Sequence, residues 1–232
     1  MTTGVNRKDR ARAKRERERR DARGRAVRRW AFPAIFVIAT IAIGVVVVAS
    51  AISSRPGPAS RSTRPSLGSA AAPVLVAEYG DFQCPSCGAW ARSVEVSFRT
   101  AFVDTGRVRM EWHDFPWIGP ESRAAANAAR CAGAQNKFWP YHDLLYANQG
   151  GENTGAFPKS RLKAFGGQVN LDATTFDACI DGGTYDAAVQ AELSAATAKG
   201  LTGTPTFEIG GQRLVGPPTL DALRAAIVAA GG

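Results

Sequence analysis

Tyr79–Gly88 has the sequence YGDFQCPSCG and carries two cysteines separated by two residues. The short apolar run 74–77, which precedes this stretch, is typical of a buried strand. After the cysteines, apolar residues recur at helical spacing from 94 to 102 and the pattern stops at Gly106, whereas residues 107–113 alternate between apolar and polar as in a strand. A strand, a helix and a strand within about 40 residues form a βαβ unit, which predicts parallel strands.

The pair Cys84 and Cys87 lies where the first strand gives way to the helix. At that place the first cysteine is close to unpaired backbone N–H groups and to the positive end of the helix dipole. These groups stabilise a thiolate and lower its pKa from ~8.5 to between ~3.5 and ~7 in known motifs of this spacing. We therefore predict a thiol–disulfide exchange centre, with Cys84 as the exposed, attacked sulfur and Cys87 as the buried resolving partner. Pro85 and Ser86 between them are expected to tune the redox potential.

Two cysteines at this spacing are also found as half of a zinc site. Such a site needs a second pair of ligands, but Cys131 and Cys179 are 48 residues apart and the only histidines are His113 and His142. We therefore expect no metal, and we interpret both histidines as structural. A purely structural disulfide within the motif is a further alternative, although so short a loop constrains little of the unfolded chain.

The remainder of the chain predicts a helical insert at about 118–200, then a hairpin at 206–215 and a last helix from 220. Asp172 and Thr184 are the expected N-caps of two insert helices. The order βαβ, helical insert, ββα predicts an α/β fold. Four apolar stripes with helical spacing mark the insert: 124–131, 141–145, 176–180 and 189–196.

Three segments resemble a known family. Tyr79–Gly88 and Thr202–Phe207 (TGTPTF) are similar to the two signatures of DsbA-type thiol–disulfide oxidoreductases, and Lys137–Leu145 (KFWPYHDLL) is similar to that family's insert. The resemblance covers about residues 73–230. It implies a thioredoxin-like fold with a helical domain inserted after the βαβ unit, which agrees with the order predicted from the residue pattern.

The resemblance also implies roles for single residues. The bond between Thr204 and Pro205 is expected to be cis, so that the backbone of Gly203 and Thr204 binds an extended substrate beside the cysteines. Glu78 is expected to be buried beneath the disulfide and to relay protons to and from Cys87. The alternatives are an ordinary Gly-Thr-Pro turn and an exposed carboxylate at the end of a strand.

Cys131 and Cys179 each lie on the apolar face of a predicted insert helix. A structural disulfide between these two helices is our leading hypothesis. Two buried free thiols and a second redox pair are the alternatives, but neither cysteine has the helix-start context of a reactive thiol. The extra pair and the membrane anchor described below resemble members of the family from Gram-positive and actinobacterial lineages.

The net charge of +9 does not indicate nucleic-acid binding by the globular part. Residues 1–29 contain 13 Lys or Arg and 4 Asp or Glu, so they account for the whole excess, and residues 30–232 are neutral overall. A neutral domain lacks the basic surface that polyanions need. We therefore expect no nucleic-acid partner and interpret 1–29 as a basic cytoplasmic tail.

Residues 30–52 contain no charged residue and are expected to form one transmembrane helix. At ~1.5 Å per residue, a helix of this length spans the ~30 Å hydrocarbon core of a bilayer. The positive-inside rule keeps the basic tail cytoplasmic, so a single-pass protein of the cell membrane is predicted, with domain 74–232 outside the cytoplasm. Cleavage of a signal peptide after Ala51 is the competing interpretation. Residues 53–73, rich in Pro, Ser and Gly, are expected to form a flexible linker.

These observations predict an oxidase that donates the Cys84–Cys87 disulfide to unfolded exported proteins with free thiols. A disulfide isomerase or reductase, and a tethered peptide-binding holdase, are the alternatives. The resemblance implies a membrane quinone-linked reoxidant of the DsbB or vitamin K epoxide reductase (VKOR) type. We expect no bound cofactor and a monomer.

Overall fold

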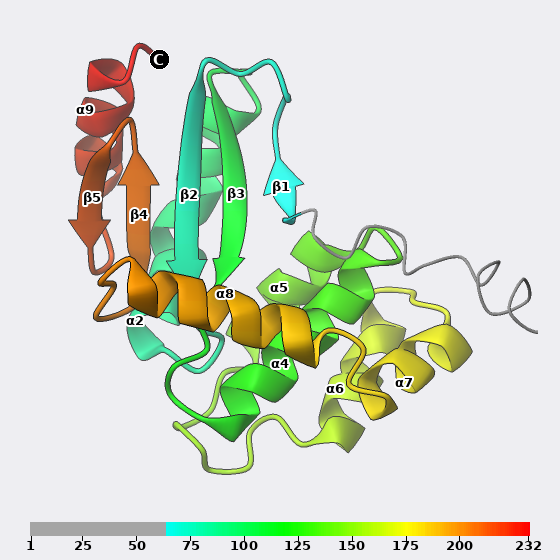
Figure 1. The fold of residues 1–232 in the computed structure, drawn as a ribbon. Coiled ribbons are helices and arrows are strands. Elements are labelled where there is room, and N and C mark those ends of the chain that lie inside the picture. The colour runs from blue at the N-terminus through cyan, green and yellow to red at the C-terminus, as the bar shows by residue number, and fades with distance from the viewer. Residues whose placement is uncertain (1–63) are drawn as a thin grey trace, which may run out of the picture. The chain divides into compact units, whose positions relative to one another are not determined.

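The computed structural model describes residues 64–232, and they contain one five-stranded mixed sheet in the order β1-β3-β2-β4-β5 (Figure 1). Strands β2 and β3 are parallel, in register from Val74 opposite Val108 to Gly80 opposite Asp114. The other three neighbouring pairs are antiparallel. The strands are β1 (Ser66–Leu67), β2 (Val74–Gly80), β3 (Val108–Asp114), β4 (Thr206–Ile209) and β5 (Gln212–Val215).

The predicted order of a βαβ unit, a helical insert and a ββα unit is confirmed. A continuous helical segment joins β2 to β3, in which two wider π turns alternate with α-helix: α2 (Pro85–Trp90), η1 (Ala91–Glu95), α3 (Val96–Phe98) and η2 (Arg99–Val103). The insert between β3 and β4 consists of α4 (Pro120–Gly133), α5 (Phe138–Ala147), α6 (Lys159–Gln168), α7 (Ala173–Asp181) and α8 (Asp186–Ala198). The helix α9 (Leu220–Ala229) closes the described chain.

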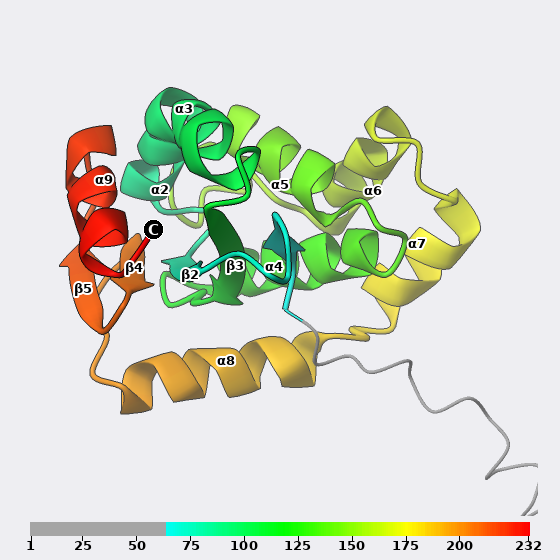
Figure 2. The same ribbon diagram turned by 90° about the horizontal axis from the view of Figure 1, so that it is seen from above.

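The two faces of the sheet are covered by different helices because successive strand residues point to opposite sides. Val76 and Met110 belong to the core that the segment α2–η2 and α9 form on one face. Ala77 and Tyr79 pack with Ala196 of α8 on the other face. Figure 2 shows α8 on one side of the strands and α2, α3 and α9 on the other.

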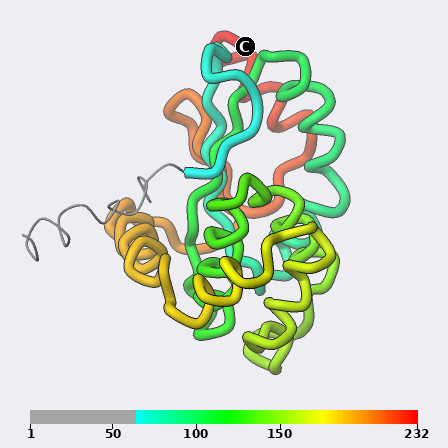
Figure 3. Tube along the Cα trace, turned by 90° about the vertical axis from the view of Figure 1, so that its right-hand side faces the viewer, coloured from blue at the N-terminus to red at the C-terminus, as the bar shows by residue number. Residues whose placement is uncertain are grey.

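The insert lies at the end of the sheet where β2 and β3 end (Figure 3). A third core joins Phe82, Cys87 and Trp112 to the insert residues Tyr141 and Leu145. The cysteine motif is therefore built into the contact between the sheet and the insert.

Two local expectations are corrected by the structure, and a third is confirmed. The sheet begins before Val74, because Ser66 and Leu67, which we assigned to the flexible linker 53–73, pair with β3. The N-cap of α8 is Tyr185 rather than Thr184. By contrast, the expected cap at Asp172 is present, since its Oδ1 accepts a hydrogen bond from the backbone N–H of Thr175 at 2.8 Å.

Helix α6 was not predicted, because the pair Gly166–Gly167 within it is typical of a turn. The structure gives the reason for Gly166. A Cβ atom at this position would lie 2.6 Å from the ring of Phe176 in α7. Glycine therefore permits α6 and α7 to pack closely, although it lowers the helix propensity of the segment.

The predicted basic tail 1–29, transmembrane helix 30–52 and most of the linker lie outside the described residues. Among residues 64–232, no helix is both long and apolar enough to cross a membrane.

Candidate active site

The cysteine pair lies at the sheet edge where β2 ends at Gly80 and the helical segment begins, with Cys84 as the N-cap of α2. Asp81, to which the sequence assigned no role, shapes the loop between them. Its carboxylate accepts hydrogen bonds from the backbone N–H groups of Gln83 (2.8 Å) and Ile118 (3.1 Å). Its carbonyl oxygen accepts one from the N–H of Cys84 (3.0 Å). The buried carboxylate thus fixes the place where the helix begins.

Both motif cysteines are free thiols, and both are buried: 6% of Cys84 is exposed and 0% of Cys87. The expectation that Cys84 is exposed is therefore corrected. The reason is that the segment around Thr204 lies against its sulfur. Cys84 is nevertheless the more accessible of the two.

The pKa values of the two thiols are shifted in opposite directions. The pKa of Cys84 is lowered from 9.0 to about 6, and the largest cause is the hydrogen bond from the Cys87 thiol. Burial opposes this effect. Hydrogen bonds from the side chain of Thr204 and from the backbone N–H groups of Cys87 and Ser86 lower the pKa further. Burial, then the hydrogen bond to Cys84 and its charge, raise the pKa of Cys87 well above 9.0. The thiolate at neutral pH is therefore on Cys84. The helix N–H groups contribute, as expected, but the neighbouring thiol contributes more.

The segment at Thr204 completes the surroundings of Cys84. The Thr204–Pro205 peptide bond is cis. In its thiol form, Sγ of Cys84 donates a hydrogen bond to the carbonyl oxygen of Thr204 at 3.2 Å. The hydroxyl of Thr206 donates to the carbonyl oxygen of Gly203 at 2.7 Å, which holds the turn before the proline. The structure thus brings the two signature segments together.

Glu78 is 0% exposed and lies on the same face of β2 as Val76. Neither of its carboxylate oxygens has a hydrogen-bond partner among the described residues. Burial, followed by the charge of Glu95, raises the pKa of Glu78 well above 4.5, although Arg99 opposes this. Glu78 in turn contributes to the raised pKa of Cys87. The alternative of an exposed carboxylate at the strand end is therefore wrong.

Sequence reasoning missed Gln149, which holds the motif loop from the insert. Its Nε2 donates hydrogen bonds to the carbonyl oxygens of Phe82 (2.9 Å) and Cys84 (2.8 Å). A Cβ atom at Gly88 would lie 2.1 Å from Oε1 of Gln149, so the glycine after the second cysteine makes room for this side chain. No spacing pattern identifies Gln149, because it acts 65 residues away from Cys84 through a tertiary contact.

Trp117 was also missed. Its side chain is 51% exposed, and its indole N–H donates to the hydroxyl of Thr204 at 3.2 Å. It therefore presents an apolar surface next to the segment that contacts Cys84.

Cys131 and Cys179 are bonded to each other and join α4 to α7, with their Cα atoms 5.9 Å apart. Both lie in helices of the insert. Pro85 is exposed at the first position of α2.

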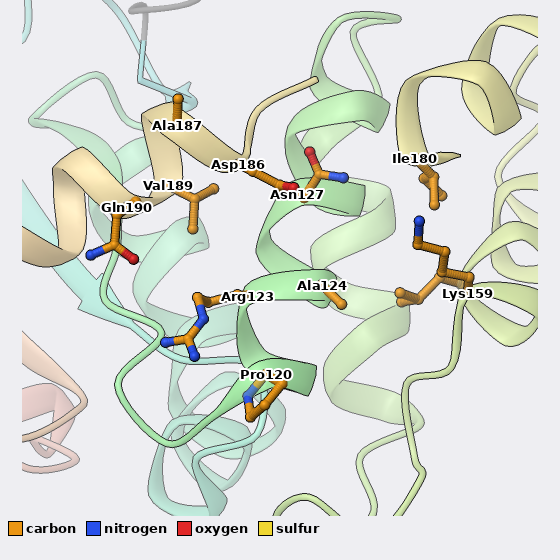
Figure 4. A pocket seen from close by; sticks show the side chains of 11 residues that line it. Pro120, Arg123, Ala124, Asn127, Lys159, Ile180, Asp186, Ala187, Val189 and Gln190 are labelled. Atoms are coloured by element: carbon orange, nitrogen blue, oxygen red, sulfur yellow. The ribbon is translucent and has the colours of Figure 1, made fainter. Parts of the chain in front are cut away.

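Several other places could accommodate a ligand, and two of them lie in or beside the insert, without a motif cysteine. Glu95, His142 and Asp143 each offer a potential metal ligand atom, all within 4.8 Å of one another, but the guanidinium of Arg99 already pairs with both carboxylates. The second place is a pocket between helices of the insert, with a volume of about 460 Å³ (Figure 4). Its wall includes the exposed Lys159.

Known proteins share this sequence pattern. Residues 60–229 match the family model described as Thioredoxin. The chain is 34% identical over 161 residues to the Na+/H+ antiporter NhaA 1 of Salinispora arenicola, a match that covers 68% of this chain and 23% of that protein. It is 40% identical over 90 residues to the probable disulfide bond formation protein D of Bacillus cereus, covering 38% of this chain and 42% of that one. The chain therefore spans less than half the length of these curated relatives.

Solved structures share the fold. BdbD from Bacillus subtilis, in the oxidised form, aligns with a TM-score of 0.67 at 23% identity, over 72% of this chain and 92% of that structure. α-DsbA1 from Wolbachia pipientis aligns with a TM-score of 0.65 at 22% identity, over 76% and 93%. A cysteine pair of unequal acidity, at a helix start opposite a cis-proline, lies within the matched region of the family model. The chain belongs to the thioredoxin family and is similar to DsbA-type thiol–disulfide oxidoreductases.

Proposed function

We propose that the enzyme is an oxidase that donates the Cys84–Cys87 disulfide to thiols of unfolded exported proteins. The observation that carries this proposal is the pKa of Cys84, which its surroundings lower to about 6. A stabilised Cys84 thiolate favours the reduced form of the pair and makes the oxidised form ready to give up its disulfide.

The proposed reaction uses the lowered pKa of Cys84 and the raised pKa of Cys87. A substrate thiolate attacks Sγ of Cys84, the Cys84–Cys87 bond breaks, and Cys87 leaves as a thiolate that takes a proton from Glu78. A second substrate thiolate then attacks the substrate sulfur of the mixed disulfide. Cys84 leaves as the stable thiolate, and the substrate holds the new disulfide. Cys87 retains the proton that it took from Glu78, because its own pKa is raised.

The segment Gly203–Pro205 is proposed to bind the substrate. The carbonyl oxygen of Thr204 lies 3.2 Å from Sγ of Cys84, so a chain paired with this backbone as an added strand brings its cysteine to the attacked sulfur. Proline at 205 has no N–H that could donate to the thiolate. Pro85 and Ser86 are proposed to set the redox potential, and the Cys131–Cys179 disulfide to stabilise the insert.

The proposed setting is a single-pass protein of the cell membrane. The tail 1–29 would lie in the cytoplasm, the helix 30–52 would cross the membrane, and the catalytic domain would act outside as a monomer without a bound cofactor. A membrane quinone-linked protein of the DsbB or VKOR type would reoxidise the cysteine pair. The composition of residues 1–52 supports this arrangement.

A redox titration of the full chain in glutathione buffers tests the oxidase function. We expect a potential well above that of thioredoxin, about −270 mV, and a reduced form more resistant to urea than the oxidised form. A potential at or below that of thioredoxin would contradict the oxidase and favour the reductase. The matched variant Cys84→Ser should have no exchange activity, whereas a holdase would retain its peptide binding.

A further inference from the structure

Two buried titratable side chains beneath the cysteine pair have polar atoms without a hydrogen-bond partner among the described residues. These atoms are both carboxylate oxygens of Glu78 and Nε2 of His142. Both residues are 0% exposed. Buried polar atoms in folded proteins nearly always have a partner, so an unpartnered acid and an unpartnered imidazole in the same region need an explanation.

Glu78 and His142 border the same side chain. Glu78 lies opposite Trp112 in the parallel pair β2–β3. The ring of His142 in α5 lies 5.0 Å from the ring of Trp112, edge to face. His142 also contacts Phe82 at 5.7 Å and Tyr146 at 4.8 Å, so its ring is enclosed by aromatic side chains from the motif loop, the sheet and the insert.

The other nitrogen of His142 leads to the surface. Nδ1 lies 2.8 Å from Oδ1 of Asp143, whose side chain is 54% exposed. Arg99 pairs with the same carboxylate at 3.0 Å and with the buried Glu95. A pocket of about 190 Å³ is lined by Glu95, Arg99 and Asp143 and opens this group of side chains to solvent.

Glu78 lies within electrostatic reach of this group. Asp143 and Glu95 are among the charges that raise its pKa, and Arg99 lowers it. Glu78 and His142 are thus both neighbours of Trp112, and His142 contacts the carboxylate of Asp143, which is in contact with solvent.

We propose that His142 and Asp143 carry protons between Glu78 and solvent during disulfide exchange. The proposal rests on the role proposed above for Glu78 and revises our expectation that His142 is structural. When Glu78 gives its proton to Cys87, it becomes a carboxylate in a buried site. Nδ1 of His142 receives a proton from solvent by way of Asp143, and Nε2 returns one to Glu78, so the imidazole ends neutral. Reoxidation of the pair runs these transfers in reverse.

His142 acts through Glu78 and does not touch the reacting sulfurs. Glu78 and Nε2 are not directly hydrogen-bonded, so the transfer needs bridging water or a rotation of the Glu78 side chain. The route therefore affects how fast the proton moves, and leaves the equilibrium between dithiol and disulfide unchanged.

The test compares His142→Phe with the matched variant His113→Phe in the full chain. Phenylalanine at 142 keeps the ring contacts and removes both nitrogens. His113 lies on the opposite face of β3, where it contacts Tyr79 with ring centroids 4.5 Å apart, and it is not part of the route. Each variant is measured for its rate of exchange with a thiol peptide and for its redox potential. The variant His142→Ala, which leaves space for a free imidazole, is measured with and without added imidazole.

We expect His142→Phe to exchange about tenfold more slowly or worse, since a positioned acid–base group contributes ~10²–10⁴-fold and His142 supplies part of that effect. Its redox potential should equal that of the unmodified enzyme, and added imidazole should restore the rate of His142→Ala. His113→Phe should retain the normal rate. An unchanged rate in His142→Phe overturns the proposal, and so does a slow rate with a shifted potential and no rescue, because that result indicates a structural role.

Asp143→Asn provides a second test at the exposed end of the route. The amide keeps a contact with Nδ1 but cannot carry a proton, so a slower rate at unchanged potential is expected, and a normal rate overturns the proposal. Failure of the oxidase function itself would instead be seen in the unmodified enzyme, as a low potential, and leaves these rate comparisons valid.

Discussion

Sγ of Cys84 lies 3.2 Å from the carbonyl oxygen of Thr204, although 120 residues separate the two in the sequence. The contact joins the start of α2 to the cis-proline segment before β4. Because the side chain of Thr204 also lowers the pKa of Cys84, one residue contributes to both the acidity of the attacked sulfur and the proposed docking of the substrate.

Thr204→Val should raise the pKa of Cys84 above about 6, because valine keeps the shape of threonine and removes its hydroxyl. The rise should be smaller than that in Cys87→Ala, since the Cys87 thiol is the largest cause of the lowered pKa. The pH dependence of alkylation by iodoacetamide measures both values. Thr202→Val, at an exposed position in the same loop, is the control and should leave the pKa unchanged.

The reduced enzyme should lose stability relative to the oxidised enzyme as the pH falls. The pKa of Cys84 is about 6 in the folded protein and 9.0 for an ordinary thiol, so the folded state holds the thiolate more strongly. This stabilisation is complete above the unfolded pKa and is lost as the pH falls through the folded one, by about 1.4 kcal/mol per pH unit between the two values. Urea unfolding of both forms between about pH 5 and about pH 8 measures it. A difference that does not change with pH would show that Cys84 titrates as an ordinary thiol.

Glu78→Gln should slow disulfide exchange, because the amide cannot pass a proton to Cys87. It should also stabilise the fold at neutral pH relative to the unmodified enzyme. Burial raises the pKa of Glu78 well above 4.5, so the cost of the acid grows as the pH rises above that value, whereas the amide has no such dependence. Urea unfolding at about pH 4 and about pH 7 should give a larger gain at the higher pH. An equal gain at both values would contradict the raised pKa.

The double variant Cys131→Ser/Cys179→Ser should be less stable by as much as ~4 kcal/mol in the chain-entropy model, because the bond closes a loop with a sequence separation of 48. Its exchange rate per folded molecule should be retained, since both cysteines lie in the insert helices. Urea unfolding and a peptide-thiol exchange assay measure the two properties. Loss of the exchange activity with the fold intact would instead indicate a second redox pair.

Sequence patterns that depend only on neighbouring residues predicted the fold well. The alternation in 107–113 and the helical spacing from 94 to 102 depend on neighbours in the sequence, and both elements are present. The position of Cys84 at a helix start was also predictable, because the N-cap is decided by the residues next to it.

Features that depend on contacts distant in sequence were not predictable. Gln149 braces the motif loop, and Glu95 lies close to His142, only after the insert has folded against the helical segment. The burial of Cys84 depends on Thr204 in the same way. Strand β1 has two residues, too few for an alternating pattern.

The hydrogen bonds from Gln149 have a consequence for the nascent chain during synthesis. A ribosome makes Cys84 65 residues before the side chain that braces its carbonyl oxygen. During that interval both motif sulfurs belong to an unsupported stretch of polypeptide, free to cross-link with any partner, including Cys131. The surroundings of the pair are therefore complete only when both Gln149 and Thr204 have been made and have folded against the motif loop.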